Sequence, residues 1–217
     1  MTEAWPWVTL VLLGAFHGVN PAMGWLFAVG LGLQERRRAA VLRSLVPIAL
    51  GHAASITAVV AVVAAAWAVI DPGAVRLVAG GVIVAFGAYR LARGWRHRAR
   101  VGMRAGFADL ALWSFLMATA HGAGLMIVPA FLGLPLSGHH HGVGNPHLGL
   151  AVGVEASIGL AIAAVALHTA AMLAVAAAVA LVIYDRVGLA ILRRAWINLD
   201  LLWAFALIGA GALVLVL

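Results

Sequence analysis

Four histidines interrupt long apolar stretches of this sequence and are its strongest chemical signal. His17, His52, His121 and His168 each stand well inside a run of hydrophobic residues. A polar side chain at such a position is costly unless a partner or a water-filled path satisfies it. Neutral imidazole binds zinc, nickel, copper or iron, and it also relays protons. The four positions therefore predict a transition-metal site or a proton path inside the apolar part of the protein.

The residues that follow His17 add further groups of suitable chemistry. Asn20 and Met23 stand three and six residues after it, where they could offer an amide oxygen and a soft sulfur. Pro21 removes one backbone hydrogen bond within a helix and so frees a carbonyl near His17. Pro129 repeats this theme later in the chain. We expect helix breaks at both prolines, with a simple kink at Pro21 and core packing of Met23 as the alternatives.

A second group of histidines lies between two apolar stretches, in the glycine-rich segment 137–147. Its members are His139, His140, His141 and His147. Four histidines so closely spaced are a compositional signal of metal binding. A flexible cluster of this kind would collect ions weakly rather than impose a coordination geometry. A solvated loop and a pH-sensitive gate stay open as alternatives.

The composition identifies the class of protein that must position these groups. Of the 217 residues, 65% are hydrophobic and 10% are charged, whereas soluble domains average about 45–50% and about 25%. Polar surface is too scarce for a soluble domain, a disordered chain or a nucleic-acid binder, even with a formal charge of +7. The absence of cysteine excludes disulfides and thiolate metal sites. The sequence therefore predicts an all-α integral membrane protein whose main partner is the lipid bilayer.

The apolar stretches are long enough for six transmembrane helices, since one crossing needs about 20 mostly apolar residues. The predicted spans are Trp5–Leu33, Leu45–Ile70, Val75–Leu91, Phe107–Leu134, Leu150–Tyr184 and Asn198–Leu217. The first, fourth and fifth exceed one straight crossing. Tilting, a break or a stretch outside the lipid must absorb the excess.

The basic residues predict the orientation of these spans. All 14 are arginine, and only Arg76 lies away from the segments that join spans one to two, three to four and five to six. Because cytoplasmic loops are enriched in basic residues, these three segments should be cytoplasmic and both termini outside. The expected location is the inner (plasma) membrane of the cell.

The tryptophans mostly stand near the ends of the predicted spans. They include Trp5, Trp7, Trp67, Trp95, Trp113, Trp196 and Trp203. This placement is typical of an aromatic belt at the membrane surface rather than of a substrate cage.

The two halves of the sequence repeat one another. A His-Gly pair occurs at His17 and again at His121, and a His-x-Ala pattern occurs around His52 and His168. Spans three and six share a glycine-rich middle, in which Gly87 aligns with Gly211, although short motifs can coincide by chance.

This repeat predicts the architecture of the chain. We expect one transmembrane domain, residues 1–217, made of three-helix repeats at 5–104 and 105–217. An odd number of spans in each half inverts the second relative to the first, and inverted repeats are typical of secondary transporters with a site at the membrane midplane. A pseudo-twofold axis would bring His17 and His121 together, with the other two histidines flanking them.

These residues resemble the superfamily of the NicO and NiCoT nickel/cobalt permeases and the LysE-type exporters. The permeases carry His-x4-Asp-His on their first metal-binding helix; His17 fits the first position, while Ala22 and Met23 replace the other two. Gly51-His52 resembles their Gly-His motif, and His121-Gly122 resembles the His-Gly of the second half in NicO-type chains. The resemblance implies a metal permease, and the two replacements favour a softer ion such as copper.

The function that we expect is transport of a transition-metal cation, nickel, cobalt, copper or zinc, by alternating access. The midplane site would comprise His17, Asn20, Met23, His52, His121 and His168, and the outer histidines would collect or release ions. One alternative is an exporter of a small organic or anionic solute that uses the histidines as a proton relay. Another is a b-type haem cytochrome. An enzyme is not expected, because no carboxylate lies clearly beside the histidines to act as general base. Self-association is left open.

Overall fold

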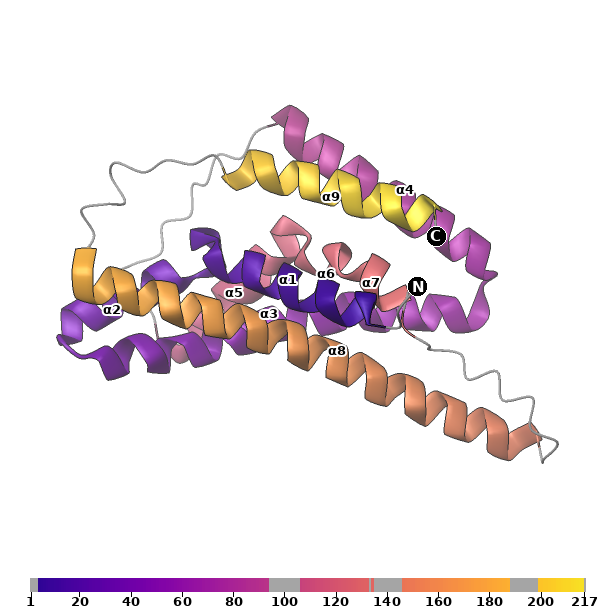
Figure 1. Ribbon diagram of the computed structural model, residues 1–217, viewed down its shortest axis with the longest axis horizontal. Coiled ribbons are helices and arrows are strands. Elements are labelled where there is room, and N and C mark those ends of the chain that lie inside the picture. The colour runs from indigo at the N-terminus through magenta and orange to yellow at the C-terminus, as the bar shows by residue number, and fades with distance from the viewer. Residues whose placement is uncertain (1–3, 94–105, 133, 135–145, 188–198, 217) are drawn as a thin grey trace.

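The computed structural model describes residues 4–93, 106–132, 134, 146–187 and 199–216, and the regular elements in these ranges are all helical (Figure 1). In chain order they are α1 (Trp5–Val19), the 3-10 helix η1 (Pro21–Met23), α2 (Trp25–Glu35), α3 (Arg38–Val69), α4 (Pro72–Arg93), α5 (Phe107–His121), α6 (Ala123–Met126), α7 (Val128–Leu132), α8 (Pro146–Val182), the π-helix η2 (Ile183–Val187) and α9 (Leu199–Val216).

Several of these helices have the length and composition that a membrane span requires. Three described segments are long and apolar enough to cross a bilayer: Arg38–Ala66, Gly73–Ala92 and Ile158–Arg186. Trp5–Val19 and Trp203–Val216 are shorter apolar helices. The all-helical class is therefore confirmed for the described residues, and the candidate spans agree with the predicted membrane character.

The first predicted span is broken immediately after the site histidine. Pro21 has no N–H, so the carbonyl of His17 accepts instead from the N–H of Asn20 at 3.1 Å. The Asn20 side chain then accepts from the N–H of Ala22 at 3.0 Å and starts the short 3-10 turn. Gly24, at φ +108°, provides the left-handed conformation that turns the chain into α2.

The fourth predicted span is broken twice. Gly122 adopts φ +71° directly after His121 and ends α5. A second break at Ile127 separates α6 from α7, and Pro129 follows it within the first turn of α7. The helix is therefore broken at Pro21 as expected, while the break expected at Pro129 lies two residues earlier, at Ile127.

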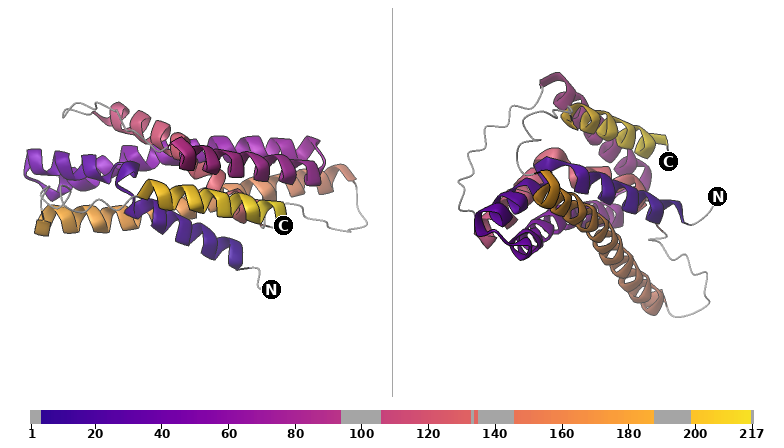
Figure 2. Two further views of the ribbon diagram at one scale, coloured as in Figure 1. Left: turned by 90° about the horizontal axis from the view of Figure 1, so that it is seen from above. Right: turned by 60° about the vertical axis from the view of Figure 1, so that its left-hand side comes forward.

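The helices form three extensively packed pairs: α1 with α8, α3 with α5, and α4 with α9. The α4–α9 pair lies side by side at one edge of the bundle (Figures 1 and 2). Glycines permit the close approach in each pair. A Cβ at Gly14 or Gly18 of α1 would collide with the backbone of α8, and a Cβ at Gly51 of α3 would collide with the backbone of α5.

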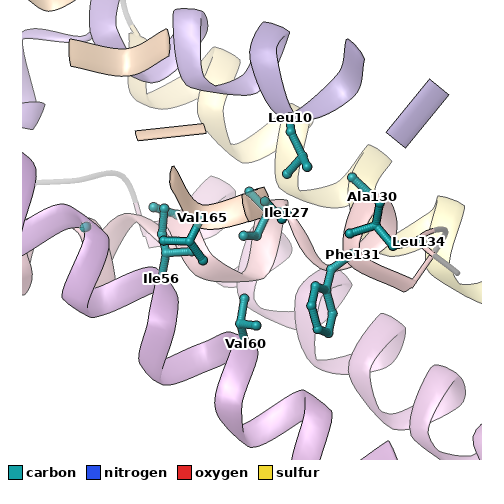
Figure 3. Close-up of a cluster of buried hydrophobic side chains, with 11 residues drawn as sticks. Leu10, Ile56, Val60, Ile127, Ala130, Phe131, Leu134 and Val165 are labelled. Carbon is teal, nitrogen blue, oxygen red and sulfur yellow. The ribbon is translucent and has the colours of Figure 1, made fainter. Parts of the chain in front are cut away.

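Buried apolar side chains form separate clusters among these pairs. The outer cluster, named for its place beside the segment expected outside, includes Leu10, Ile56, Phe131 and Val165 from α1, α3, α7 and α8 (Figure 3). The inner cluster, beside the arginine-rich turn of α2 and α3, includes Trp25, Ala28, Val41, Leu45, Ile48 and Ala176. A third cluster joins α4, α9 and α6 around Trp203.

Candidate metal centre

Three of the predicted histidines meet inside the bundle. His17 of α1, His52 of α3 and His168 of α8 each present a ring nitrogen, and these nitrogens lie within 4.8 Å of one another. All three side chains are fully buried. Because each comes from a different helix, the group forms only when α1, α3 and α8 pack together.

The spacing of the rings suits a single metal ion. His17 lies 5.2 Å from His52 and 5.0 Å from His168, measured between ring centroids. The Nε2 atoms of His52 and His168 are 3.4 Å apart. Two nitrogen ligands at about 2.0–2.1 Å from one ion, in trigonal or tetrahedral geometry, are about 3.3–3.6 Å apart. The separation of these two nitrogens is therefore already that of two ligands of one ion.

Backbone carbonyls orient two of the rings. Nδ1 of His17 donates to the carbonyl of Leu13 at 2.7 Å, and Nδ1 of His168 donates to the carbonyl of Leu10 at 3.1 Å. A carbonyl can only accept, so the proton of each ring is on Nδ1 and the lone pair is on Nε2. A hydrogen bond of this kind to a ligand histidine is the usual support of a metal site.

His52 is held differently. Its Nδ1 is buried and makes no hydrogen bond to the described residues, while its Nε2 faces that of His168. Since His168 keeps its proton on Nδ1, the His52–His168 contact requires the proton of His52 to be on Nε2. An ion that binds there must displace this proton to Nδ1 or out of the site.

The structure does not bring His121 into the group, although it is fully buried. The Trp203 ring contacts both histidine rings, with its centroid 4.4 Å from that of His17 and 5.9 Å from that of His121. The indole N–H donates to the backbone carbonyl of His121. His17 and His121 therefore share the Trp203 ring as a neighbour, while the group of three ring nitrogens in the described residues contains His17 and not His121.

The other predicted site residues have structural places. Asn20 is buried, but its amide oxygen is used in the turn before α2, so it is not offered to the three histidines. Met23 is buried in the same turn and lies outside the group of ring nitrogens. The outer histidines at positions 139, 140 and 141 fall outside the described residues, as does the side chain of His147 in the first turn of α8.

No protein-family model, curated protein or solved structure matches the chain. The site must therefore be interpreted from its own geometry.

Two residues of the site region carried no clear signal in the sequence. Trp203 was expected at the membrane surface, yet it is fully buried and stacks on Phe16 at 5.0 Å. Arg90 was expected at a cytoplasmic span end, yet it is 5% exposed and donates to the carbonyl of Ala120 at 3.0 Å. Both side chains bind carbonyls that the break at Gly122 leaves without helical partners, and this need arises only from the fold.

Proposed function

We propose that this protein is a multi-pass membrane transporter for a transition-metal cation, with His17, His52 and His168 as the ligands of the transported ion. The observation that carries the proposal is the meeting of three buried imidazoles with two Nε2 atoms at the spacing of metal ligands. Neutral imidazole suits zinc, nickel, cobalt and copper. The ion is the substrate here, not a resident cofactor.

The residues around the site fit a transport intermediate in which the ion is closed off from both sides of the membrane. Along α3, Ile48 of the inner cluster precedes His52 and Ile56 of the outer cluster follows it. Along α8, Val165 of the outer cluster precedes His168 and Ala176 of the inner cluster follows it. The ion would thus be enclosed between two apolar clusters (Figure 3 shows the outer one). Alternating access would open one cluster at a time.

The broken helices favour a cation over an anionic solute. α1 ends two residues after His17, and α5 ends at His121. The Trp203 side chain donates to the carbonyl of His121 and also contacts the ring of His17. The C-terminal end of a helix carries a partial negative charge of about half an electron. The end of α1, directly after His17, stabilises positive charge, whereas the carbonyls at the end of α5 are already bound by Arg90 and Trp203. Discontinuous helices line ion sites in known transporter folds.

The helix pairs support the inverted three-helix repeat. In the proposed repeat α1 is equivalent to α5, and α3 is equivalent to α8. The α1–α8 pair should therefore have the α3–α5 pair as its counterpart. In α1–α8, Gly14 contacts His168 and Gly18 contacts Met172, so these helices run parallel. In α3–α5, Ser114 bonds to Ile48, and the later residue Ser55 bonds to Thr119, so these also run parallel. An inverted repeat of three spans requires this pattern.

The α4–α9 pair adds a reciprocal contact. A Cβ at Gly87 would meet Ile208 at 2.8 Å and the carbonyl of Ala204 at 3.2 Å. A Cβ at Gly211 would meet Val84 at 2.7 Å and the carbonyl of Gly80 at 2.9 Å. An offset of 124 residues, obtained by aligning Gly87 with Gly211, converts one set of contacts into the other. This reciprocity is expected where a pseudo-twofold axis crosses an antiparallel pair.

The ion pair between Arg38 and Asp185 supports the predicted orientation. Their charged atoms lie 2.8 Å apart, which brings the start of α3 to the end of α8. The arginine-rich segments next to these two elements therefore belong to one side of the membrane, as the cytoplasmic assignment requires.

Calorimetric titration of the purified full-length protein with nickel, cobalt, copper and zinc tests the metal site. We expect His17→Ala, His52→Ala and His168→Ala each to abolish tight binding of the preferred ion, while His97→Ala, in an arginine-rich segment, does not. Uptake of that ion into proteoliposomes should be lost in the same three variants and retained in His97→Ala. Absence of binding above background in the wild type, or equal uptake by His17→Ala, would refute the proposal.

A proton-coupled exporter of a small solute is the second candidate. The observation that favours it is the direct contact of His52 and His168, since two imidazoles joined through Nε2 can pass a proton. It predicts solute transport that depends on the proton gradient and is lost in His52→Ala, together with no metal binding in the titration above.

A further inference from the structure

We propose that the transported ion is a soft monovalent cation, Cu(I) in its chemistry, and that Met172 supplies a thioether ligand beside the three histidines. This inference rests on the proposed function, because it specifies the ion for the same site. It follows from the charge of the donors, from the position of Met172 and from the coordination that such an ion prefers.

Among the described side chains, the donor set carries no negative charge. The buried polar side chains of the described residues are histidine, asparagine, serine and arginine, and none is a carboxylate. The acids with described side chains, Glu35, Asp71, Asp109 and Asp185, are exposed at helix ends. Glu155 stands 13 residues before His168 on α8, which places it roughly 20 Å along the helix axis.

A neutral buried site discriminates by ionic charge. The cost of transferring an ion from water into a low-dielectric interior grows with the square of its charge, so a divalent ion costs roughly four times as much as a monovalent ion of equal size. Sites for divalent ions in proteins commonly offset this cost with carboxylate or thiolate ligands. Transfer into a neutral donor set therefore costs a monovalent ion less desolvation free energy than Ni²⁺ or Zn²⁺.

Met172 is placed to contribute a soft ligand. It follows His168 by four residues, so the two side chains share one face of α8. That face packs on α1, where a Cβ at Gly18, directly after His17, would collide with the carbonyl of Met172. Met172 is 1% exposed, and the three apolar clusters formed by the described residues do not include it.

Thioether and imidazole ligands together are selective. Soft thioether ligands favour Cu(I), whereas imidazole alone suits zinc, copper and nickel alike. A methionine at this position would also let an ion exchange ligands as the site opens, because the thioether side chain is long and flexible. Sequence reasoning chose Met23 for this role from its spacing to His17. We assign this role instead to Met172, whose carbonyl lies against Gly18 of α1 although it stands 155 residues after His17 in the sequence.

The test compares ions and variants of the full-length protein in detergent. Cu(I) affinity is measured anaerobically by competition with a chromophoric chelator, and Zn²⁺ and Ni²⁺ affinities by calorimetry. We expect Cu(I) to bind the tightest. Met172→Leu should weaken Cu(I) binding by about tenfold and leave Zn²⁺ binding unchanged. Met126→Leu, at a buried methionine of the third apolar cluster, is the matched control and should change neither.

X-ray absorption at the copper edge keeps the proposal testable if Met172→Leu fails to fold. The wild-type spectrum should contain one sulfur scatterer in addition to nitrogens. Tighter binding of Zn²⁺ or Ni²⁺ than of Cu(I), or a spectrum with nitrogen alone, would overturn the inference while the proposed metal transport stands. Asp200 stands three residues before Trp203 on α9, and its side chain is not among those described. Loss of divalent binding in Asp200→Asn would overturn the inference too, because a carboxylate would then belong to the site. Failure of every ion to bind would instead refute the proposed function.

Discussion

The close approach of α1 and α8 sets the distance between His17 and His168, and Gly14→Ala tests this directly. A Cβ at position 14 would overlap the carbonyl oxygen of His168 and lie 2.9 Å from the Cβ of Ala171. Neither obstacle is the end of a flexible side chain, so the two helices must separate by about 1 Å to restore ordinary contact distances. Metal–ligand distances are constrained to within about 0.2 Å. We therefore expect a tenfold to hundredfold loss of affinity for the preferred ion, a range of about 10–100 typical of disturbed ligand support.

The stability of Gly14→Ala should change less than its affinity. Overpacking costs about 1–3 kcal/mol, while replacement of a helical glycine by alanine regains about 0.5–1 kcal/mol. Gly159→Ala is the matched control, since it lies on α8 with nothing within 4 Å of the added Cβ. It should bind the ion like the wild type. Wild-type affinity in Gly14→Ala, with unaltered thermal unfolding, would show that helix separation does not determine the site.

Three further predictions concern the packing around the site. Trp203→Phe removes the donor to the His121 carbonyl and should lower the free energy of unfolding by about 1–3 kcal/mol; unchanged denaturation would contradict this hydrogen bond. Ser114→Ala removes the 2.7 Å bond to the carbonyl of Ile48 and should cost about 0.6–1.7 kcal/mol in detergent unfolding. Ser44→Ala, whose bond stays within α3, should cost less. An absorption spectrum should show no Soret band, because stacked rings with Nε2 atoms 3.4 Å apart leave no room for a porphyrin; stoichiometric haem would exclude the proposed site.

The membrane character and the helix breaks could be predicted because they depend on local sequence. Apolar length decides whether a helix can cross a bilayer, and the missing N–H of Pro21 decides where α1 ends. The break at Gly122 could not be predicted in the same way. Gly18 follows His17 as Gly122 follows His121, yet Gly18 is helical and Gly122 has φ +71°. The same dipeptide takes two conformations because Arg90 and Trp203 bind the carbonyls exposed at the end of α5.

The residue types at the site could be predicted, but their grouping could not. Buried histidine is a strong signal on its own, and three of the four predicted rings do converge. Which three of the four histidines meet depends on which helices pack in parallel. That packing is decided by contacts between residues more than 100 positions apart, such as Gly14 with His168. The proposed role of Met172 could not be predicted for the same reason, since Met172 lies beside Gly18 only after α1 and α8 pack.

The departure from the proposed symmetry has a specific origin in α4 and α9. The register that aligns Gly87 with Gly211 also aligns Ala79 with Trp203, so one half carries a methyl group where the other carries an indole. The indole lies against both His17 and His121 and binds the end of α5. The first half therefore contributes two histidines to the group of three and the second half one, while His121 stays at the helix break. We expect this difference to give the two access states unequal affinities, because opening either apolar cluster would separate a different subset of the three ligands.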